Sequence, residues 1–231
     1  ECFYIANLLS KEEIAKEVEP EGKVYSWWDG EDYVKAVLNI LEKEGLRGKT
    51  IGTSQSVRAF HVLNLMGSGE IRFVAARDLM DETRIHKSSQ ELDALRKAAS
   101  IADEALKRAL LEIRPGMSER KIREILFGKM VELGGERPEG LICTGPNTGY
   151  PHYALVGEGR TLEERDILLL DFGCTYKGFQ SDMTRTFFFG EPSEKERRVY
   201  EAVLRANLAG EEAAVLGAWI PDIDRAARDV I

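Results

Sequence analysis

One stretch of the sequence decides the fold, and it reads Leu170-Asp171-Phe172-Gly173-Cys174-Thr175-Tyr176-Lys177-Gly178-Phe179-Gln180-Ser181-Asp182-Met183-Thr184-Arg185-Thr186. Two strand-like runs each carry one aspartate, and Lys177-Gly178 between them is typical of a tight turn. A two-residue turn predicts that Asp171 lies opposite Thr184 and diagonal to Asp182. Both carboxylates then face the same side of the sheet, with Cβ atoms about 7–8 Å apart.

Two carboxylates on one face of an apolar sheet need a partner. An ionised aspartate in such a place costs free energy unless it is paired or bound to a metal, and two of them also repel each other. A divalent cation offsets both costs, and two metals about 3.5–4 Å apart can share one carboxylate. The alternative is that each aspartate caps a turn or forms a salt bridge, for which Arg185 is close enough in sequence.

A histidine is the next candidate. His152 lies in a turn-rich loop, Gly145-Pro146-Asn147-Thr148-Gly149-Tyr150-Pro151-His152-Tyr153. Loops on a rigid scaffold commonly carry function, and a histidine there can bind metal, move protons or donate to a carbonyl. A lone loop histidine is more often merely exposed, so both interpretations stay open at this point.

The pattern of the chain changes near residue 85. Before it, short strands (3–7, 24–28, 50–53 and 71–75) alternate with helices (32–44 and 57–65), which is typical of an α/β unit. Residues 81–87 read as a polar linker. After it, capping-box serines at Ser88 and Ser193 and a cap at Ser118 begin three helices, and strands are expected at 140–144, 166–176 and 179–189. This second part keeps helices and strands in separate blocks, so its class is α+β.

The apolar faces of two of these helices can be listed. For the helix after Ser88 we expect Leu92, Leu95, Ala99, Ala102, Leu106 and Ala109. For the helix after Ser118 we expect Ile122, Ile125, Leu126, Met130 and Leu133.

Composition excludes several classes of function. The 231 residues include 32 basic and 40 acidic side chains, for a net charge of −8, which disfavours nucleic acid as a partner. No apolar run approaches the roughly 18 residues of a membrane helix. The three cysteines, Cys2, Cys143 and Cys174, lack CxxC spacing. We therefore expect packed small side chains rather than disulfides, in a reducing cytoplasm. The missing initiator Met and the helical pattern at the last residues predict a piece of a longer chain, cut at both ends.

Several motifs together resemble one protein family, the pita-bread metallopeptidases, which include Xaa-Pro dipeptidase (prolidase), aminopeptidase P and methionine aminopeptidase. The double-aspartate stretch carries the resemblance. Matching segments around it, in order, are Arg84-Ile85-His86-Lys87-Ser88-Ser89-Gln90-Glu91-Leu92, Arg114-Pro115-Gly116-Met117-Ser118-Glu119, Pro151-His152-Tyr153 and Gly190-Glu191-Pro192-Ser193-Glu194-Lys195-Glu196. The resemblance implies the first half of a pita-bread catalytic domain over residues 84–231. Residues 1–83 resemble the carboxy-terminal part of a creatinase-like α/β amino-terminal domain.

The resemblance also implies a site with two divalent metal ions, Mn, Co or Zn. Asp171 would bind one metal and Asp182 would bridge both, while Thr184 would orient a ligand. His152 would be the catalytic histidine that binds substrate and donates toward the developing charge. A further His and two Glu ligands are expected later in the chain, and Arg185–Ile231 contains no histidine. We therefore expect little activity from these 231 residues alone.

The function implied is hydrolysis of Xaa-Pro peptide bonds, as a dipeptidase or aminopeptidase. The substrate would be a peptide with proline at its second position, and the assembly would be a homodimer. One alternative is a non-catalytic binding or scaffold protein with the same fold. Another is a creatinase-type amidinohydrolase, which works without metals. That alternative predicts replacement of both aspartates, and both are present.

Overall fold

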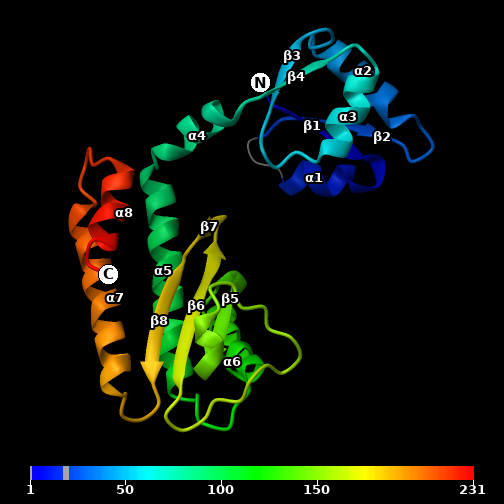
Figure 1. The fold of residues 1–231 in the computed structure, drawn as a ribbon. Helices are drawn as coiled ribbons and strands as arrows, with labels where there is room; N and C mark the ends of the chain where they lie inside the picture. Colours follow the sequence, from blue (N-terminus) through cyan, green and yellow to red (C-terminus); the bar gives the residue numbers. More distant parts are fainter. Residues whose placement is uncertain (1, 18–20) are drawn as a thin grey trace. The chain divides into compact units, whose positions relative to one another are not determined.

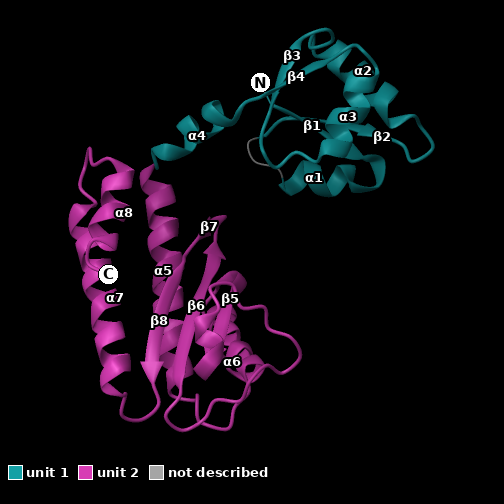
Figure 2. Ribbon diagram, in the orientation of Figure 1, with its two compact units in different colours: residues 1–87 teal, residues 88–231 magenta. Residues whose placement is uncertain are grey.

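The computed structural model describes residues 2–17 and 21–231, and it divides into two compact units, Glu1–Lys87 and Ser88–Ile231 (Figure 2). The division falls a few residues after the boundary expected from the sequence. Each unit is described by itself, as unit 1 and unit 2.

Unit 1 alternates strands with helices (Figure 1): β1 (Phe3–Asn7), η1 (Leu8–Ser10), α1 (Lys11–Glu17), β2 (Lys23–Trp27), α2 (Tyr33–Lys43), β3 (Thr50–Thr53), α3 (Ala59–Gly67), β4 (Arg72–Ala75) and α4 (Arg77–Ile85). β1 pairs with β2 and β3 pairs with β4, both in parallel. A parallel pair needs a crossover between its strands, which the alternating sequence pattern provides. The core consists of buried aliphatic side chains: Val37, Leu38, Leu41, Leu65 and Ile71.

The segment predicted to be a polar linker, residues 81–87, ends where the two units divide, but most of it is helical. α4 continues to Ile85. Arg77 and Asp81 lie one turn apart and form an ion pair, with 3.2 Å between Nε and Oδ2. A run of charged residues indicates exposure to solvent, not loss of helix, because pairs spaced by four residues stabilise an exposed helix.

Unit 2 contains α5 (Ser89–Leu110), α6 (Glu119–Glu132), β5 (Glu136–Thr144), η2 (Gly145–Gly149), β6 (Ile167–Tyr176), β7 (Phe179–Gln180), β8 (Met183–Phe188), α7 (Glu194–Ala213) and α8 (Ile220–Arg228). The sheet is antiparallel, with β6 paired to β5 on one side and to β7 and β8 on the other. The three predicted caps are confirmed: Ser88 and Ser193 form capping boxes, and Ser118 accepts from the Lys121 amide.

The helices α5 and α6 pack against one face of this sheet, α5 on β6 and α6 on β5. The apolar stripe predicted for α6 is confirmed, but that for α5 is partly wrong. Leu92 is 39% exposed, while Ala94, Ala98 and Ala105 are buried. Alanine lets a helix approach a sheet closely, so the buried line follows the small side chains instead of the large ones.

The hairpin register predicted from the sequence is confirmed. Lys177 and Gly178 have φ values of +48° and +81°, as a primed two-residue turn requires. Asp171 lies opposite Thr184. The single strand expected over 179–189 is wrong, because Ser181 and Asp182 interrupt it between β7 and β8.

Ser181 accounts for this interruption. Its hydroxyl accepts a hydrogen bond from the Cys174 amide at 3.1 Å, and its own amide donates to the Cys174 carbonyl at 3.0 Å. A side-chain oxygen thus takes the place of a main-chain acceptor. The close approach also explains Gly173, since any Cβ at that position would overlap the Ser181 carbonyl oxygen.

One face of the sheet packs against α5 and α6, and the other face points away from them. Side chains from alternate positions of β5 and β6, Ile142, Leu168, Leu170, Phe172 and Cys174, join the core beneath the helices. Asp171 and Thr184 alternate to the face away from the helices. The strand pattern therefore places Asp171 and Thr184 of the predicted site on the face of the sheet opposite to α5 and α6.

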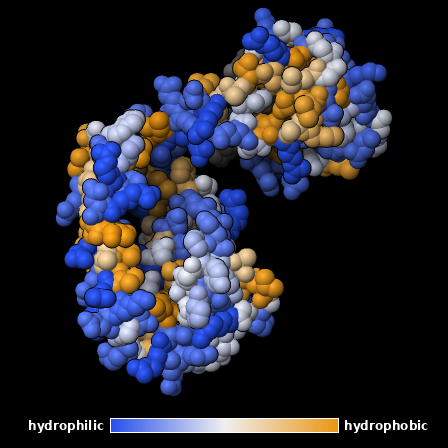
Figure 3. Space-filling view, in the orientation of Figure 1, coloured by the Kyte–Doolittle hydropathy of each residue, from blue (hydrophilic) through white to orange (hydrophobic). Residues whose placement is uncertain are grey.

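Valine and leucine side chains on α7 are exposed and gather in an apolar patch over that helix (Figure 3): Val199, Val203, Leu204 and Leu208. No helix among the described residues is long and apolar enough to span a membrane. Cys143 and Cys174 are buried as predicted, but Cys2 is exposed, so the prediction for that thiol was wrong.

Replacing Gly173 by alanine should destabilise the protein by at least about 2 kcal/mol, because the added methyl group overlaps main-chain atoms that cannot rotate away. The control is Gly128→Ala in α6, where nothing lies within 4 Å of the added methyl. That change should stabilise by about 0.5–1 kcal/mol, since alanine favours a helix interior. Urea unfolding measures both, and equal effects of the two substitutions would contradict this account of Gly173.

Candidate metal site and the loop beside it

The centre of the candidate site is a side-chain pair across β6 and β8. The Thr184 hydroxyl donates to Asp171 Oδ1 at 2.9 Å. Asp171 is half-buried, and Asp182, just before β8, is exposed. The threonine holds one carboxylate oxygen of Asp171, which leaves the other oxygen free to bind a cation.

The salt-bridge alternative does not describe these aspartates. Arg185 donates instead to the Thr184 carbonyl, at 2.8 Å. Within the described part of the chain, neither Asp171 nor Asp182 forms an ion pair. Two carboxylates of one hairpin remain without a cationic partner, which is the charge pattern that a bound cation would neutralise.

These residues fit part of a metal site. Carboxylate oxygens are suitable ligands for Mn and for other divalent ions of the kind predicted. Across residues 2–17 and 21–231, however, no three His, Cys, Asp or Glu side chains come together as ligands. Asp171 and Asp182 thus supply two donors of a set that needs more.

The structure places His152 in the loop that follows η2, with its side chain exposed. It forms no hydrogen bond or ion pair with either aspartate in the regions that the structure describes. Its neighbour Tyr153 is half-buried and bonded, so the loop is anchored at the residue directly after the histidine.

The anchor is Glu119, a residue that the sequence interpretation did not select. Its side chain is fully buried at the first position of α6. Oε1 accepts from the Thr144 amide at 2.8 Å, from the Thr144 hydroxyl at 3.1 Å and from Asn147 Nδ2 at 2.9 Å. Oε2 accepts from the Tyr153 hydroxyl and the Arg160 amide, both at 2.9 Å. Every partner is a donor, so the group is an ionised carboxylate.

Opposing effects act on the pKa of Glu119. Burial raises it, but the hydrogen bonds from Asn147, from the amides of Arg160 and Thr144, and from Tyr153 outweigh burial, and the pKa lies below its usual value.

Burial, and then the charges of Glu119 and Asp171, raise the pKa of the Cys143 thiol to about 11. Cys143 thus lies near both carboxylates and is not a reactive thiol.

Little in the sequence indicated that Glu119 would anchor this loop. Glu119 follows the Ser118 cap, where an acidic residue is ordinary because it suits the helix dipole. Its donors lie 25 to 41 residues away along the chain. Only the combination of a first-turn glutamate with a polar loop between two strands could have pointed to it.

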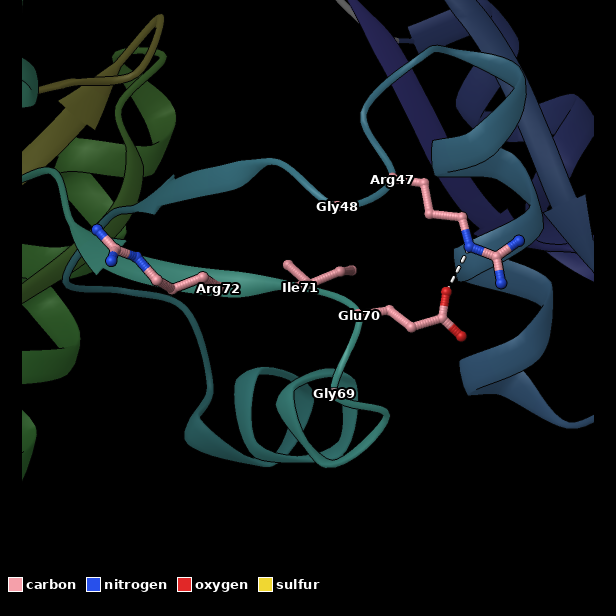
Figure 4. A pocket seen from close by; sticks show the side chains of 6 residues that line it. All are labelled: Arg47, Gly48, Gly69, Glu70, Ile71 and Arg72. Carbon is pink, nitrogen blue, oxygen red and sulfur yellow. Dashed lines mark hydrogen bonds and ion pairs between the residues drawn. The ribbon is translucent and has the colours of Figure 1, made fainter.

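A separate depression lies in unit 1 and has a volume of about 560 Å³ (Figure 4). Its wall comes from the loops before β3 and β4. Arg47 is engaged there by Glu70 and, at 2.6 Å, by Glu42. Arg72 points away from that ion pair (Figure 4). The charges of the wall are largely neutralised among themselves, so it has none of the features of the candidate site.

Comparison with known proteins adds a family and several relatives. Residues 93–231 match the model of metallopeptidase family M24. An Xaa-Pro dipeptidase of Pyrococcus furiosus is 32% identical over 186 residues, which are 79% of this chain and 53% of that protein. An Xaa-Pro dipeptidase of Lactobacillus helveticus is 29% identical over 99% of this chain and 63% of its own length.

Solved structures give the same result for the fold. The crystal structure of a prolidase from Thermococcus sibiricus aligns with a TM-score of 0.90 at 26% identity, over 99% of this chain and 62% of that one. The pita-bread fold is therefore confirmed. The chain spans about half the length of the first curated relatives that it matches.

Acid should destabilise the protein through Glu119. The pKa of this group is lower in the folded state than the ordinary 4.5, so its contribution is complete above that value and disappears as the pH falls through the folded pKa. Urea midpoints measured from pH 7 to pH 3 should decline more steeply for the unchanged protein than for Glu119→Gln. Glu124→Gln, on the exposed side of the same helix, should keep the steep decline. Parallel curves for all three proteins would contradict the assignment.

Proposed function

This chain belongs to metallopeptidase family M24, and from that premise we propose that it forms part of a metal-dependent peptidase that cleaves Xaa-Pro bonds. The observation that carries the proposal is the pair of unneutralised aspartates in one hairpin, with Thr184 bonded to Asp171. They lie in the segment that matches the family. The names of the relatives support the choice of substrate class.

In this proposal Asp171 and Asp182 hold two divalent ions, Mn, Co or Zn, together with a His and two Glu supplied elsewhere in the whole protein. When bound, the metals supply Lewis-acid polarisation of the scissile carbonyl. Thr184 keeps one oxygen of Asp171 occupied and thereby fixes the direction of the other.

His152 has a different task. An imidazole N–H at the tip of an exposed loop can donate to the carbonyl oxygen of a peptide as negative charge develops there. Its exposure suits a group that meets a substrate from solvent. The substrate we propose is a peptide with proline in its second position.

We also propose a cellular compartment, a class of partner and an oligomeric state. The three free cysteines support a reducing compartment, for which we propose the cytoplasm. The net charge of −8 argues against nucleic acid as a partner. A homodimer is proposed from the family resemblance, and light scattering of the purified protein tests it.

A non-catalytic scaffold is the second candidate function. It is favoured by one observation, that the described residues bring together no third metal ligand. The two candidates differ in metal binding, since a scaffold that has lost its metals gains nothing from keeping two unpaired carboxylates in one hairpin.

In the whole protein, replacing Asp182 by alanine should abolish both metal binding and hydrolysis, because the change removes the oxygen donors proposed to lie between the metals. Titration calorimetry with Mn²⁺ and release of proline from an Xaa-Pro dipeptide measure the two effects. Asp103→Ala, on the exposed side of α5, is the control and should change neither. Full turnover by the Asp182 variant, or by metal-stripped protein, would exclude the two-metal proposal.

Replacing Thr184 by valine should weaken metal binding or activity by about 10- to 100-fold, the usual range when a ligand loses the group that orients it. Valine has the same shape as threonine but cannot donate to Asp171. Thr184→Ser keeps the hydroxyl and should retain most of the affinity. If valine and serine behave alike, the hydrogen bond does not orient Asp171.

A further inference from the structure

We propose that Glu119 is a positioning residue for His152, because its carboxylate ties together the loop that carries this histidine. The inference rests on the proposed function of His152. Glu119 reaches the loop at four places: Thr144 at the end of β5, Asn147 in η2, Tyr153 directly after His152, and Arg160 where the chain returns.

The bond to Tyr153 is what controls the histidine. Near His152 the side chains of Tyr150 and Val156 are 63% and 82% exposed, and only Leu155 is, like Tyr153, half-buried. The first turn of α6 also holds the more distant part of the loop, where Arg120 Nε donates to the Gly157 carbonyl at 2.6 Å. The Tyr153 hydroxyl is therefore the anchor nearest to the histidine, and it bonds to a buried charge that cannot shift.

The backbone around the Glu119 carboxylate fixes the position of that carboxylate. Gly159 has a φ of +69°, and a Cβ there would overlap Glu119 Oε2. Only glycine satisfies both the backbone conformation and the close approach. The loop thus packs its backbone directly against the acceptor, and a displacement of Glu119 would move the loop with it.

Glutamine cannot replace this carboxylate. Each oxygen accepts from one backbone amide, Oε1 from Thr144 and Oε2 from Arg160. Whichever way a glutamine amide turned, its NH₂ group would face a backbone N–H, which cannot rotate to become an acceptor. A buried donor would be left without an acceptor, and the loop would separate from α6.

A double-mutant cycle with His152 tests the inference. In the whole protein, Glu119→Gln should lower kcat by about 10-fold or more, as expected when a group close to the reacting atoms is misplaced. The same change in a His152→Ala background should have almost no further effect, because the group being positioned is gone. Mn²⁺ affinity should stay unchanged in every variant. Glu124→Gln, which is exposed on the same helix, is the matched control and should leave kcat unchanged.

Hydrogen exchange provides a readout that does not depend on activity. In Glu119→Gln the amides of residues 144–160 should exchange faster, while those of β6 and β8 keep their protection. If that variant does not fold, Tyr153→Phe takes its place, since it removes one donor and leaves the carboxylate paired. It should show a smaller loss of kcat that also vanishes in the His152→Ala background.

Two results would overturn the inference: an equal loss of kcat with and without His152, or unchanged exchange in residues 144–160. Absence of Xaa-Pro hydrolysis by the unchanged, metal-loaded whole protein, of which these residues form part, is a different result, which would defeat the proposed function. In that case exchange alone decides whether Glu119 positions the loop, since faster exchange confined to residues 144–160 supports it and unchanged exchange overturns it.

Discussion

The register between β6 and β8 is the constraint on which the candidate site depends. The Lys177-Gly178 turn sets it, because its φ values of +48° and +81° allow a connection of only two residues. Side chains alternate along a strand, so a slip of one residue would turn Asp171 into the helix-covered core and bring a core side chain to the face where Asp171 lies. Burial of Phe172 and Leu170 opposes that slip, so the same packing that stabilises the sheet also aims the carboxylate.

The second ionised group, Glu119, is stabilised in a different way. Glu119 is fully buried, and the cost of removing it from water is offset by five hydrogen bonds, all accepted by its two oxygens. The position of such a group is strongly constrained, because losing any donor leaves negative charge uncompensated in a region of low dielectric constant. It therefore joins the start of α6 to a loop that has little apolar surface with which to pack.

The parts of the structure that were predictable from the sequence are those set by neighbours along the chain. The Ser88 and Ser193 caps, the turn and the Asp171–Thr184 pairing all follow from spacing within a few residues. Glu119 was not predictable in this way, because its partners are distant along the chain. The break at Ser181 also escaped prediction, since it depends on a hydroxyl replacing a main-chain acceptor across the hairpin.

The two halves of the candidate site are therefore held by different means, and this difference suits their proposed tasks. Metal ligands must keep fixed mutual distances, and Asp171 lies on a strand fixed by hydrogen bonds on both sides. A group that meets substrate must be reachable from solvent, and His152 is exposed on a loop. An exposed loop loses precision unless something buried controls it. The Tyr153 hydroxyl, bonded to Glu119 at 2.9 Å, connects the exposed histidine to the interior without burying the histidine itself.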